Sequence, residues 1–521
     1  EEIPWVIGRH TGLKPVLINT TTGEFKISDL PLKSIDAVYN QEVQITPAST
    51  NLTNATFIPN FNAFTMTYDG DSCLVTISET TLTTYVTGGS GGNQSIDLTD
   101  PAYDTLSELV SEINSWTGYT CTLDGAGGLP STELRKTESQ DIVSNGQILL
   151  KLPDKNHEYT VDVQGAPDDA SGTYTGTANA VIERPPDIAY YLLREKAGMN
   201  YLTEIDYSTF ESLRTAFEGF RYRKVLDTQD RLFSILSELA QEAYMPIYTE
   251  PSTGKIRAIN ADWDTSESID NYYWETGKYS RIEEHTLLEE ANIADIYNKV
   301  VIRFDYDPSE GVFKDKVEVE DSTSQGDSNS GIDETKEKRL DCYWVSGDVD
   351  VLSIQYTGTG TCTLTITGEG TDTARKLTTS ITGGSGETEF DIDLEGSSYD
   401  TLLELKNAID GDSDYTCSIV SSDFNNLPSK ALRDVDNLDI GSSQSLKFSY
   451  GKLLAMKYLN WHKDRHRRKQ AVVSLAGMDQ ELGKAIAVRS IQESSDKRVR
   501  VKQLVMDPSR YRVQIIGVEE G

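Results

Sequence analysis

The sequence predicts a multidomain, β-rich α+β protein in which two copies of one small α+β module are inserted into larger β domains. Its 521 residues exceed what one hydrophobic core covers, so we expect about three to five domains. Residues 64–143 and 352–441 share an ordered series of motifs, which indicates an internal duplication. Short runs with strand-like alternation lead into each copy and resume after it, so both copies interrupt β structure.

Residues 1–63 and 144–184 are expected to form one discontinuous domain, the N-terminal β domain. Short apolar runs split by glycine, and a segment that alternates with period two, are typical of strands. The same pattern returns after the first copy. The expected strands are residues 5–7, 15–18, 35–39, 148–150 and 159–163.

The two copies, inserted module 1 (residues 64–143) and inserted module 2 (residues 352–441), repeat the same motifs in the same order. Each opens on a tyrosine-led strand that reaches a cysteine. Gly-Gly-Ser-Gly, Tyr-Asp-Thr-Leu-x-Glu-Leu, Tyr-Thr-Cys and Leu-Pro-Ser then follow. They occupy residues 88–91, 103–109, 119–121 and 129–131 in module 1, and 383–386, 399–405, 415–417 and 427–429 in module 2.

Each module is expected to contain one capped helix. Thr105 with Glu108, and Thr401 with Glu404, have the spacing of a capping box, in which hydroxyl and carboxylate accept from each other's backbone amides. Apolar residues at helical spacing follow. We therefore predict strand, strand, helix, strand in each module. The Gly-Gly-Ser-Gly segment is predicted to be a β-turn, because neither a Lys-Ser/Thr pair nor a helix start follows it.

Residues 185–285 are predicted to form a helical, α+β middle domain. Pro185 and Pro186 suit the first turn of a helix, and Gly198 suits its end. Further helices are expected at about residues 208–217 and 228–242. A hairpin of residues 246–248 and 255–259 follows, turning at 251–254.

Residues 286–351 and 442–521 are expected to form a second discontinuous domain, the C-terminal β domain. A strand at 300–306 precedes an acidic loop at 320–338. After module 2, residues 449–468 are predicted to form one long helix with a basic end. The closing strands are expected at 471–475, 485–489, 499–505 and 512–518.

Both modules are interpreted as insertions into strand-to-strand connections, which surface loops tolerate well. Equivalent insertion points would make the two β domains around them related to each other.

The net charge is −35, with 83 acidic and 48 basic residues. Such a chain repels nucleic acid and anionic membranes. One interpretation is solubility alone, and the other is a surface along which a polyanion passes without adhering. No apolar run approaches the length of about 18 residues that a membrane-spanning helix needs, and no signal segment opens the chain.

Five cysteines leave one unmatched between the modules. Cys73 and Cys121 occupy the places of Cys362 and Cys417, and Cys342 lies outside both copies. We favour a buried, reduced pair in each module over a disulfide, because nothing marks the chain as secreted. No CxxC motif or histidine cluster suggests zinc. Asp305, Asp307 and the acidic loop lack the ordered ligands of a calcium loop, so no metal is expected.

One basic cluster stands against the acidic background and is the candidate subunit-docking site. It can be a solvated helix end, with cations favoured by the helix dipole, or a dock for an acidic neighbour such as another copy of the chain. Nucleic acid is the third interpretation, with Trp461 as the adjacent aromatic residue. The cluster comprises His462, Lys463, Arg465, His466, Arg467, Arg468 and Lys469.

No motif points to catalysis. The sequence has no G-x-S-x-G elbow, Walker lysine loop or H-E-x-x-H, and its many carboxylates have no diagnostic spacing. We therefore expect a protein that is not an enzyme and has no cofactor.

Three runs resemble the tail-hub (tail-tip or baseplate-hub) proteins of tailed bacteriophages. The opening run covers residues 4–18 and 34–39, where Ile7 replaces the usual Tyr. The middle run contains Pro-Pro-Asp-Ile at 185–188, Leu192-Leu193, Ile205-Asp206 with Phe210, residues 232–239, Gly254-Lys-Ile256 and residues 298–302. The closing run has Leu482-Gly483, Met506-Asp-Pro508 and residues 512–516, with Lys484 where the family has Asp.

The resemblance implies a structural protein of the phage tail tip, made in the host cytoplasm. Family members form homotrimers with two tube-like β-barrel hub domains per subunit, giving a pseudo-six-fold ring between the tail tube and the tip or fibre proteins. A distal tail or tube protein and the tape-measure protein are the implied partners, and DNA passes the acidic lumen without specific binding. The modules would project outward. The alternatives are a carbohydrate-binding receptor adhesin that uses the two modules, and a wall-degrading enzyme.

Overall fold

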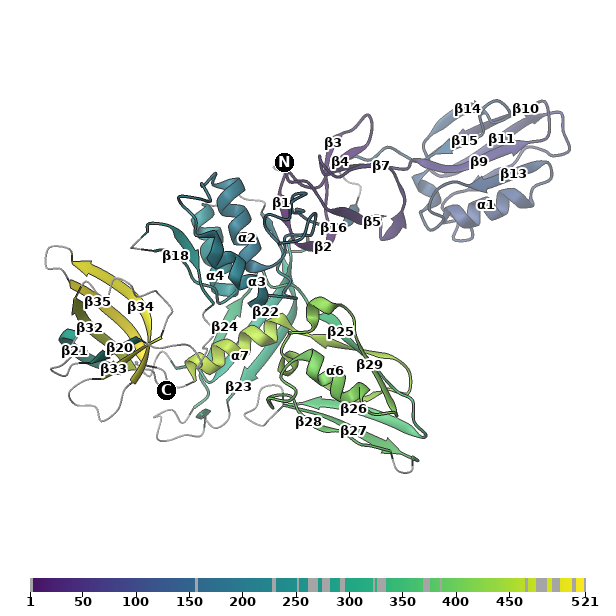
Figure 1. Ribbon diagram of the computed structural model, residues 1–521. Coiled ribbons are helices and arrows are strands. Elements are labelled where there is room, and N and C mark those ends of the chain that lie inside the picture. Colours follow the sequence, from purple (N-terminus) through teal and green to yellow (C-terminus); the bar gives the residue numbers. More distant parts are fainter. Residues whose placement is uncertain are drawn as a thin grey trace. The chain divides into compact units, whose positions relative to one another are not determined.

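The computed structural model divides the chain into two compact units, residues 1–182 with 223–229 and residues 183–222 with 230–521 (Figure 1). The described residues are 3–154, 158–226, 231–250, 253–260, 270–273, 282–290, 296–321, 324–325, 334–368, 375–384, 387–463, 467–474, 485–489, 497–507 and 512–519.

Outside module 1, the first unit contains two four-stranded antiparallel sheets and a two-stranded ribbon. The sheet orders are β2-β16-β5-β6 and β3-β4-β8-β7, and the ribbon pairs β1 with β17. The strands are β1 (Trp5–Ile7), β2 (Arg9–Leu13), β3 (Val16–Asn19), β4 (Glu24–Lys26), β5 (Ser34–Asn40), β6 (Val43–Ile45), β7 (Pro47–Asn51), β8 (Thr56–Pro59), β16 (Tyr159–Gln164) and β17 (Lys224–Leu226).

Three buried aromatic rings join these two sheets. Phe25 on β4 stacks on Phe57 on β8, with 5.3 Å between ring centroids. Tyr159, on β16 of the other sheet, lies 4.8 Å from Phe25. Buried aromatic contacts of this kind contribute about 0.5–1.5 kcal/mol each beyond the area that they bury. All five strands predicted for the N-terminal β domain are present, but the one predicted at 148–150 is β15 (Gln147–Leu149), which pairs with β9 (Asn62–Tyr68) within module 1.

Module 1 is a two-sheet unit with one helix. Its sheets have the orders β12-β11-β10-β14 and β13-β9-β15, and helix α1 packs against β13 (Figure 1). The elements are β9 (Asn62–Tyr68), β10 (Ser72–Ile77), β11 (Thr81–Thr87), β12 (Ser95–Asp97), α1 (Leu106–Ser115), β13 (Tyr119–Leu123), β14 (Thr137–Asp141) and β15 (Gln147–Leu149).

Module 2 repeats this topology strand for strand, which confirms the duplication. Its sheets are β28-β27-β26-β30 and β29-β25-β31, with α6 against β29. The elements are β25 (Val349–Tyr356), β26 (Thr361–Thr367), β27 (Lys376–Thr382), β28 (Asp391–Asp393), α6 (Leu402–Asp410), β29 (Tyr415–Ile419), β30 (Val435–Asp439) and β31 (Gln444–Phe448). The fold is richer in strands than the predicted strand, strand, helix, strand.

Both predicted capping boxes are confirmed. In α1 the Thr105 hydroxyl accepts from the amide of Glu108, whose carboxylate accepts from the Thr105 amide. Thr401 and Glu404 make the same pair of bonds at the start of α6. Each box satisfies amides that would otherwise lack a partner at the helix start.

The helices and hairpin predicted between the modules are also present. They are α2 (Pro185–Tyr191), the π-helical continuation η2 (Leu192–Lys196), α3 (Tyr207–Ala216), α4 (Leu232–Glu242), β18 (Ile247–Thr249) and β19 (Ile256–Ala258). Gly198 follows with a φ of 67°, a left-handed conformation that glycine adopts without strain. Residues 251–252 of the predicted turn lie outside the described residues.

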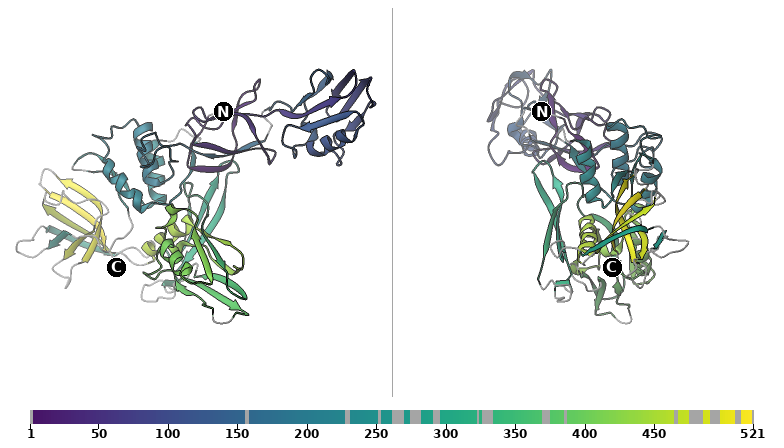
Figure 2. Two further views of the ribbon diagram at one scale, coloured as in Figure 1. Left: turned by 45° about the vertical axis from the view of Figure 1, so that its right-hand side comes forward. Right: turned by 90° about the vertical axis from the view of Figure 1, so that its left-hand side faces the viewer.

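A three-stranded sheet and one helix carry module 2. Strand β22 (Lys299–Asp307) lies between antiparallel β23 (Val312–Glu320) and parallel β24 (Glu337–Asp341). Helix α7 (Tyr450–His462) packs across β22 and β23 (Figure 2). Gly451 permits this close approach, because a Cβ atom there would lie 2.5 Å from the buried ring of Phe304 on β22.

The remaining strands form a six-stranded sheet of order β20-β33-β34-β35-β32-β21. They are β20 (Asp270–Tyr273), β21 (Ile282–Glu290), β32 (Arg467–Ser474), β33 (Ala485–Arg489), β34 (Lys497–Asp507) and β35 (Arg512–Glu519). β21 and β32 are antiparallel neighbours in this sheet, so residues 291–466 are an insertion between two adjacent strands. Module 2 lies within that insertion, so the second unit is built by nested insertion.

Two sequence-based predictions are wrong. The helix predicted over residues 449–468 ends at His462, and Arg467 begins strand β32, because β21 and β35 pair with it on both sides. Module 2 lies between strand β24 and helix α7, and not between two strands.

The sheets around the two modules also differ in strand order, and no sheet of the described residues closes into a barrel. Most of the predicted acidic loop, residues 322–323 and 326–333, lies outside the described residues, as do Leu482, Gly483, Lys484 and Pro508.

Candidate functional site

The predicted basic cluster is divided between the end of α7 and the start of β32. His462 is the last residue of the helix and Lys463 caps it. Residues 467–469 open β32. Arg465 and His466 lie outside the described residues. The cluster therefore does not form a single helical face.

His462 and Lys463 are engaged within the second unit. The ammonium of Lys463 lies 2.9 Å from a carboxylate oxygen of Asp321. The amide of Tyr297 donates to the carbonyl of His462 at 3.0 Å, and the hydroxyl of Ser324 donates to the carbonyl of Lys463 at 3.1 Å. These contacts satisfy carbonyls that a helix leaves unpaired at its end.

Strand register gives two arginines of the cluster acidic cross-strand neighbours. Glu290 lies opposite Arg467, and Glu289 opposite Arg468, at the end of β21. The pairing of residues 467 and 468 with β21 does not follow from the predicted helix over residues 449–468.

A buried charge cluster that the sequence analysis missed fastens module 2 to α7. Lys452 on α7 and Arg375 at the start of β27 are both about 2% exposed or less. Their cationic nitrogens lie 3.3 and 2.7 Å from the same carboxylate oxygen of Asp434. Both also donate to the carbonyl of Leu432. The only signal in the sequence was the position of Lys452, three residues before Ala455 and so on the same face of the helix, where a lysine indicates a buried cation.

This charge cluster is particular to module 2. In module 2 the carbonyl of Arg375 accepts from the amide of Leu394, and in module 1 the carbonyl of Thr80 accepts from the amide of Leu98. Thr80 therefore occupies the position in module 1 that Arg375 occupies in module 2. The common fold therefore does not need the cluster.

A second group of charges lies at the same junction. Asp348, just before β25, is paired through Nε of Arg433 at 2.9 Å, and Arg433 also contacts Asp315 on β23 at 3.2 Å. Burial raises the pKa of Asp348 to about 6, although the positive charge of Arg433 acts in the opposite direction. The neighbouring carboxylate of Asp315 also raises this pKa, whereas the hydrogen bond with Ser449 lowers it.

The middle domain contains a buried carboxylate held by two arginines. Asp187, in the first turn of α2, is 1% exposed. Its oxygens lie 2.6 Å from Arg184 and 3.0 Å from Arg214 on α3. This pairing ties α2 to α3, so the Asp of the Pro-Pro-Asp-Ile motif has a structural role.

Asn298 has a similar role at the start of β22. It is fully buried, and its side chain donates to the carbonyl of Glu334 and accepts from the amide of Lys336. Its carbonyl accepts from the amide of Asp321. One residue of the resembling segment thus joins β22 to both ends of the predicted acidic loop.

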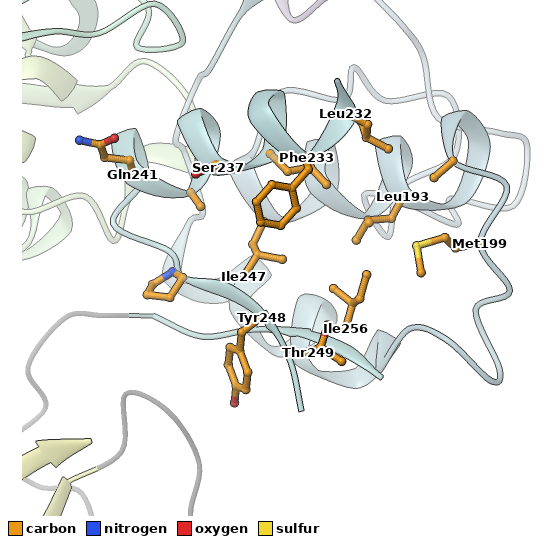
Figure 3. Close-up of a pocket in the computed structure, with 14 residues that line it drawn as sticks. Leu193, Met199, Leu232, Phe233, Ser237, Gln241, Ile247, Tyr248, Thr249 and Ile256 are labelled. Atoms are coloured by element: carbon orange, nitrogen blue, oxygen red, sulfur yellow. The ribbon is translucent and has the colours of Figure 1, made fainter. Parts of the chain in front are cut away.

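An apolar pocket of about 450 Å³ lies between α4, η2 and the β18–β19 hairpin. In Figure 3 the side chains of Leu193, Met199, Phe233, Ile247 and Ile256 project toward this space. Phe233 is 80% exposed. The polar side chains in its lining are Ser237, Gln241, Tyr248 and Thr249, so the pocket can bind an apolar group but offers no acid, base or metal ligand.

Groups that could do chemistry are buried or dispersed. All five cysteines are buried free thiols, and burial raises the pKa of Cys121 and Cys417 to about 12. The described residues contain no group of three or more His, Cys, Asp or Glu placed to hold a metal ion. Among these residues, no helix is long and apolar enough to cross a membrane.

No protein-family model matches the chain, and no curated protein matches it. Solved structures that resemble it include a chain from the virion of a native gene transfer agent particle, 9% identical with a TM-score of 0.40, covering 100% of this chain and 85% of that one.

Two further similar structures are the 43 kDa tail protein of prophage MuSo2 from Shewanella oneidensis and the tail protein from Neisseria meningitidis MC58. The first is 9% identical with a TM-score of 0.27, covering 92% of this chain and 97% of that one. The second is 8% identical with a TM-score of 0.30, covering 93% and 96%.

Proposed function

We propose that the chain is a structural protein of a phage virion, the hub at the tip of the tail. In this role it forms a homotrimeric, pseudo-six-fold ring that joins the tail tube to tip or fibre proteins. DNA and the tape-measure protein pass through the ring, and a distal tail or tube protein binds it. The chain is not an enzyme and uses no cofactor.

The observation that carries this proposal is where the family-like segments lie. The opening run lies on β1, β2, β3 and β5, and the closing run on β34 and β35. The motifs of the middle run lie on or next to α2, η2, α3, α4, β19 and the start of β22. All of them belong to the framework outside the modules. The family resemblance and the framework of the fold therefore coincide.

The charge of the chain supports the same role. A homotrimer carries three times the net charge of −35, and a ring of that charge repels DNA rather than retaining it. The buried groups of the resembling segments, Asp187 and Asn298, hold elements together and do not face a reaction site. Both features suit a structural protein.

The molar mass of the purified chain tests the proposal. Light scattering after size exclusion is expected to give three times the mass of one chain, and electron micrographs a ring with an axial hole. A strictly monomeric chain in a fully assembled particle would contradict the hub.

The same measurement tests the proposed docking by the basic cluster. Lys469→Glu is expected to weaken the trimer more at low salt than at high salt, because docking to an acidic neighbour is electrostatic. Lys33→Glu, at an exposed lysine of the first unit, is the control. Equal trimer stability in both variants would remove Lys469 from the interface.

A further inference from the structure

One sheet face of module 1 has an uncharged centre, although the chain as a whole is highly charged. In the sheet β12-β11-β10-β14, alternate residues such as Cys73, Val75 and Leu82 point into the core and are fully buried. On β10 and β11 the opposite face is formed by cross-strand pairs without any charge, and the edge strands flank them with two carboxylates, Asp141 beside Leu74 and Asp97 beside Thr81. The uncharged pairs are Ser72 with Thr87, Leu74 with Tyr85, and Thr76 with Thr83.

The same face of module 2 provides an internal comparison. Its pairs are Thr361 with Thr382, Thr363 with Ser380, and Thr365 with Thr378. The outer pairs are hydroxyl-bearing in both copies. The hydroxyls of Thr76 and Thr365 have a structural role, because each accepts from the amide of a positive-φ residue, Ser139 or Asn437, in the neighbouring strand.

The two faces differ at their centre. Module 2 has Thr363 and Ser380 there, whereas module 1 has the half-buried Leu74 beside Tyr85, whose side chain is 64% exposed. A large aromatic ring held in the open on a rigid sheet is the type of group that anchors binding sites. It is framed by the hydroxyls of Ser72, Thr83 and Thr87.

The chemistry of this face selects one class of partner. Nucleic acid and other polyanions require cations, which the face lacks, and the chain's charge repels them. A sugar chain without charge presents apolar ring faces that can stack on Tyr85 and hydroxyls that can exchange hydrogen bonds with Ser and Thr. The centre of the face carries no charge, and the carboxylates beside it can accept hydrogen bonds from sugar hydroxyls but repel anions, so the face complements a neutral polysaccharide.

We infer that the β10–β11 face of module 1 binds a neutral polysaccharide through Tyr85, and that module 2 keeps the same scaffold without the binding centre. The copies thus have different roles. Binding of this kind is independent of the proposed trimeric hub, since it concerns one module of each subunit.

Affinity electrophoresis of the full chain tests the inference. The probes are native gels that contain a β-glucan, a galactan or a mannan, with polygalacturonate as the anionic comparison. Wild type is expected to be retarded by at least one neutral polymer. Tyr85→Ser introduces the residue that module 2 has at the equivalent position, Ser380, and is expected to weaken binding at least about tenfold. Tyr85→Trp is expected to retain binding.

Tyr201→Ser, at a 44% exposed tyrosine outside the modules, is the matched control and is expected to bind as wild type. The reciprocal double variant Thr363→Leu with Ser380→Tyr, made in the Tyr85→Ser background, is expected to restore retardation. No retardation by any neutral polymer, or equal retardation of Tyr85→Ser, would overturn the inference. Self-association that depends on Tyr85 would also overturn it, because a second copy would then occupy the face.

Discussion

Buried charges at the junction of module 2 and its carrier decide how that junction responds to pH. Asp348 has a pKa raised to about 6 from the usual 3.8, so the folded state keeps a proton that the unfolded state has already released between those values. The stability from this group is fully present below about pH 4 and is lost as pH rises through about 6. Asp348 therefore opposes folding at neutral pH.

We expect Asp348→Asn to remove this dependence. The difference in unfolding free energy, wild type minus variant, should fall by about 1–2 kcal/mol between pH 4.5 and 7, a figure reduced for partial exposure. Urea unfolding monitored by tryptophan fluorescence at several pH values measures it. Asp350→Asn, which removes an exposed carboxylate two residues away, is the control. A difference that does not change with pH would contradict the assignment.

Local patterns were sufficient to predict most elements, and non-local contacts explain the failures. The capping boxes at Thr105 and Thr401, Gly198 and the hairpin strands depend on neighbours in sequence, and all are present. Residues 463–468 contain no glycine or proline, so their sequence alone continues the helix. The helix nevertheless ends at His462, and Arg467 and its successors pair instead with β21 and β35, which are distant in sequence.

The site residues show the same limit. The cluster from His462 to Lys469 was visible as charge, but its division between a helix end and a strand was not. Lys452 and Arg375 could not be recognised from the sequence, because a buried cation is identifiable only together with its partner, Asp434. Asp434 lies 18 positions from Lys452 and 59 positions from Arg375, so no local pattern shows the contact.

The capping boxes make a prediction about single elements. Thr105→Ala is expected to destabilise α1 by about 1 kcal/mol, because the amide of Glu108 loses its acceptor, and Thr401→Ala to do the same in α6. Hydrogen exchange should show faster exchange in the first turn of the altered helix alone. Ser107→Ala, an exposed position in the first turn of α1, should be neutral or slightly stabilising. Equal exchange in Thr105→Ala and Ser107→Ala would mean that the box contributes nothing.

At the scale of the whole molecule, nested insertion separates the framework from the modules. Both modules begin and end on antiparallel neighbours, since Asn62 pairs with Leu149 and Val349 with Phe448. Opposed residues in such a pair lie only about 4.5–5.5 Å apart, which two glycines span. Each module can therefore be replaced by a short linker without stretching the chain around it.

Excision of the two modules is expected to have unequal consequences. Replacement of residues 63–148 by Gly-Gly should leave the mass of the assembly at three times that of the shortened chain, because the framework carries the family-like segments. Replacement of residues 350–447 should lower the stability of the second unit, because α7 loses the side chains of module 2 that cover it, including both partners of Lys452. In the intact chain, Asp434→Ala should destabilise the second unit by roughly 3–5 kcal/mol, because Lys452 and Arg375 then stay buried without a carboxylate. Adding Lys452→Met to Asp434→Ala should recover part of that loss. Light scattering and thermal unfolding of these proteins measure the effects, and loss of the trimer on removal of module 1 would place assembly contacts in the module itself.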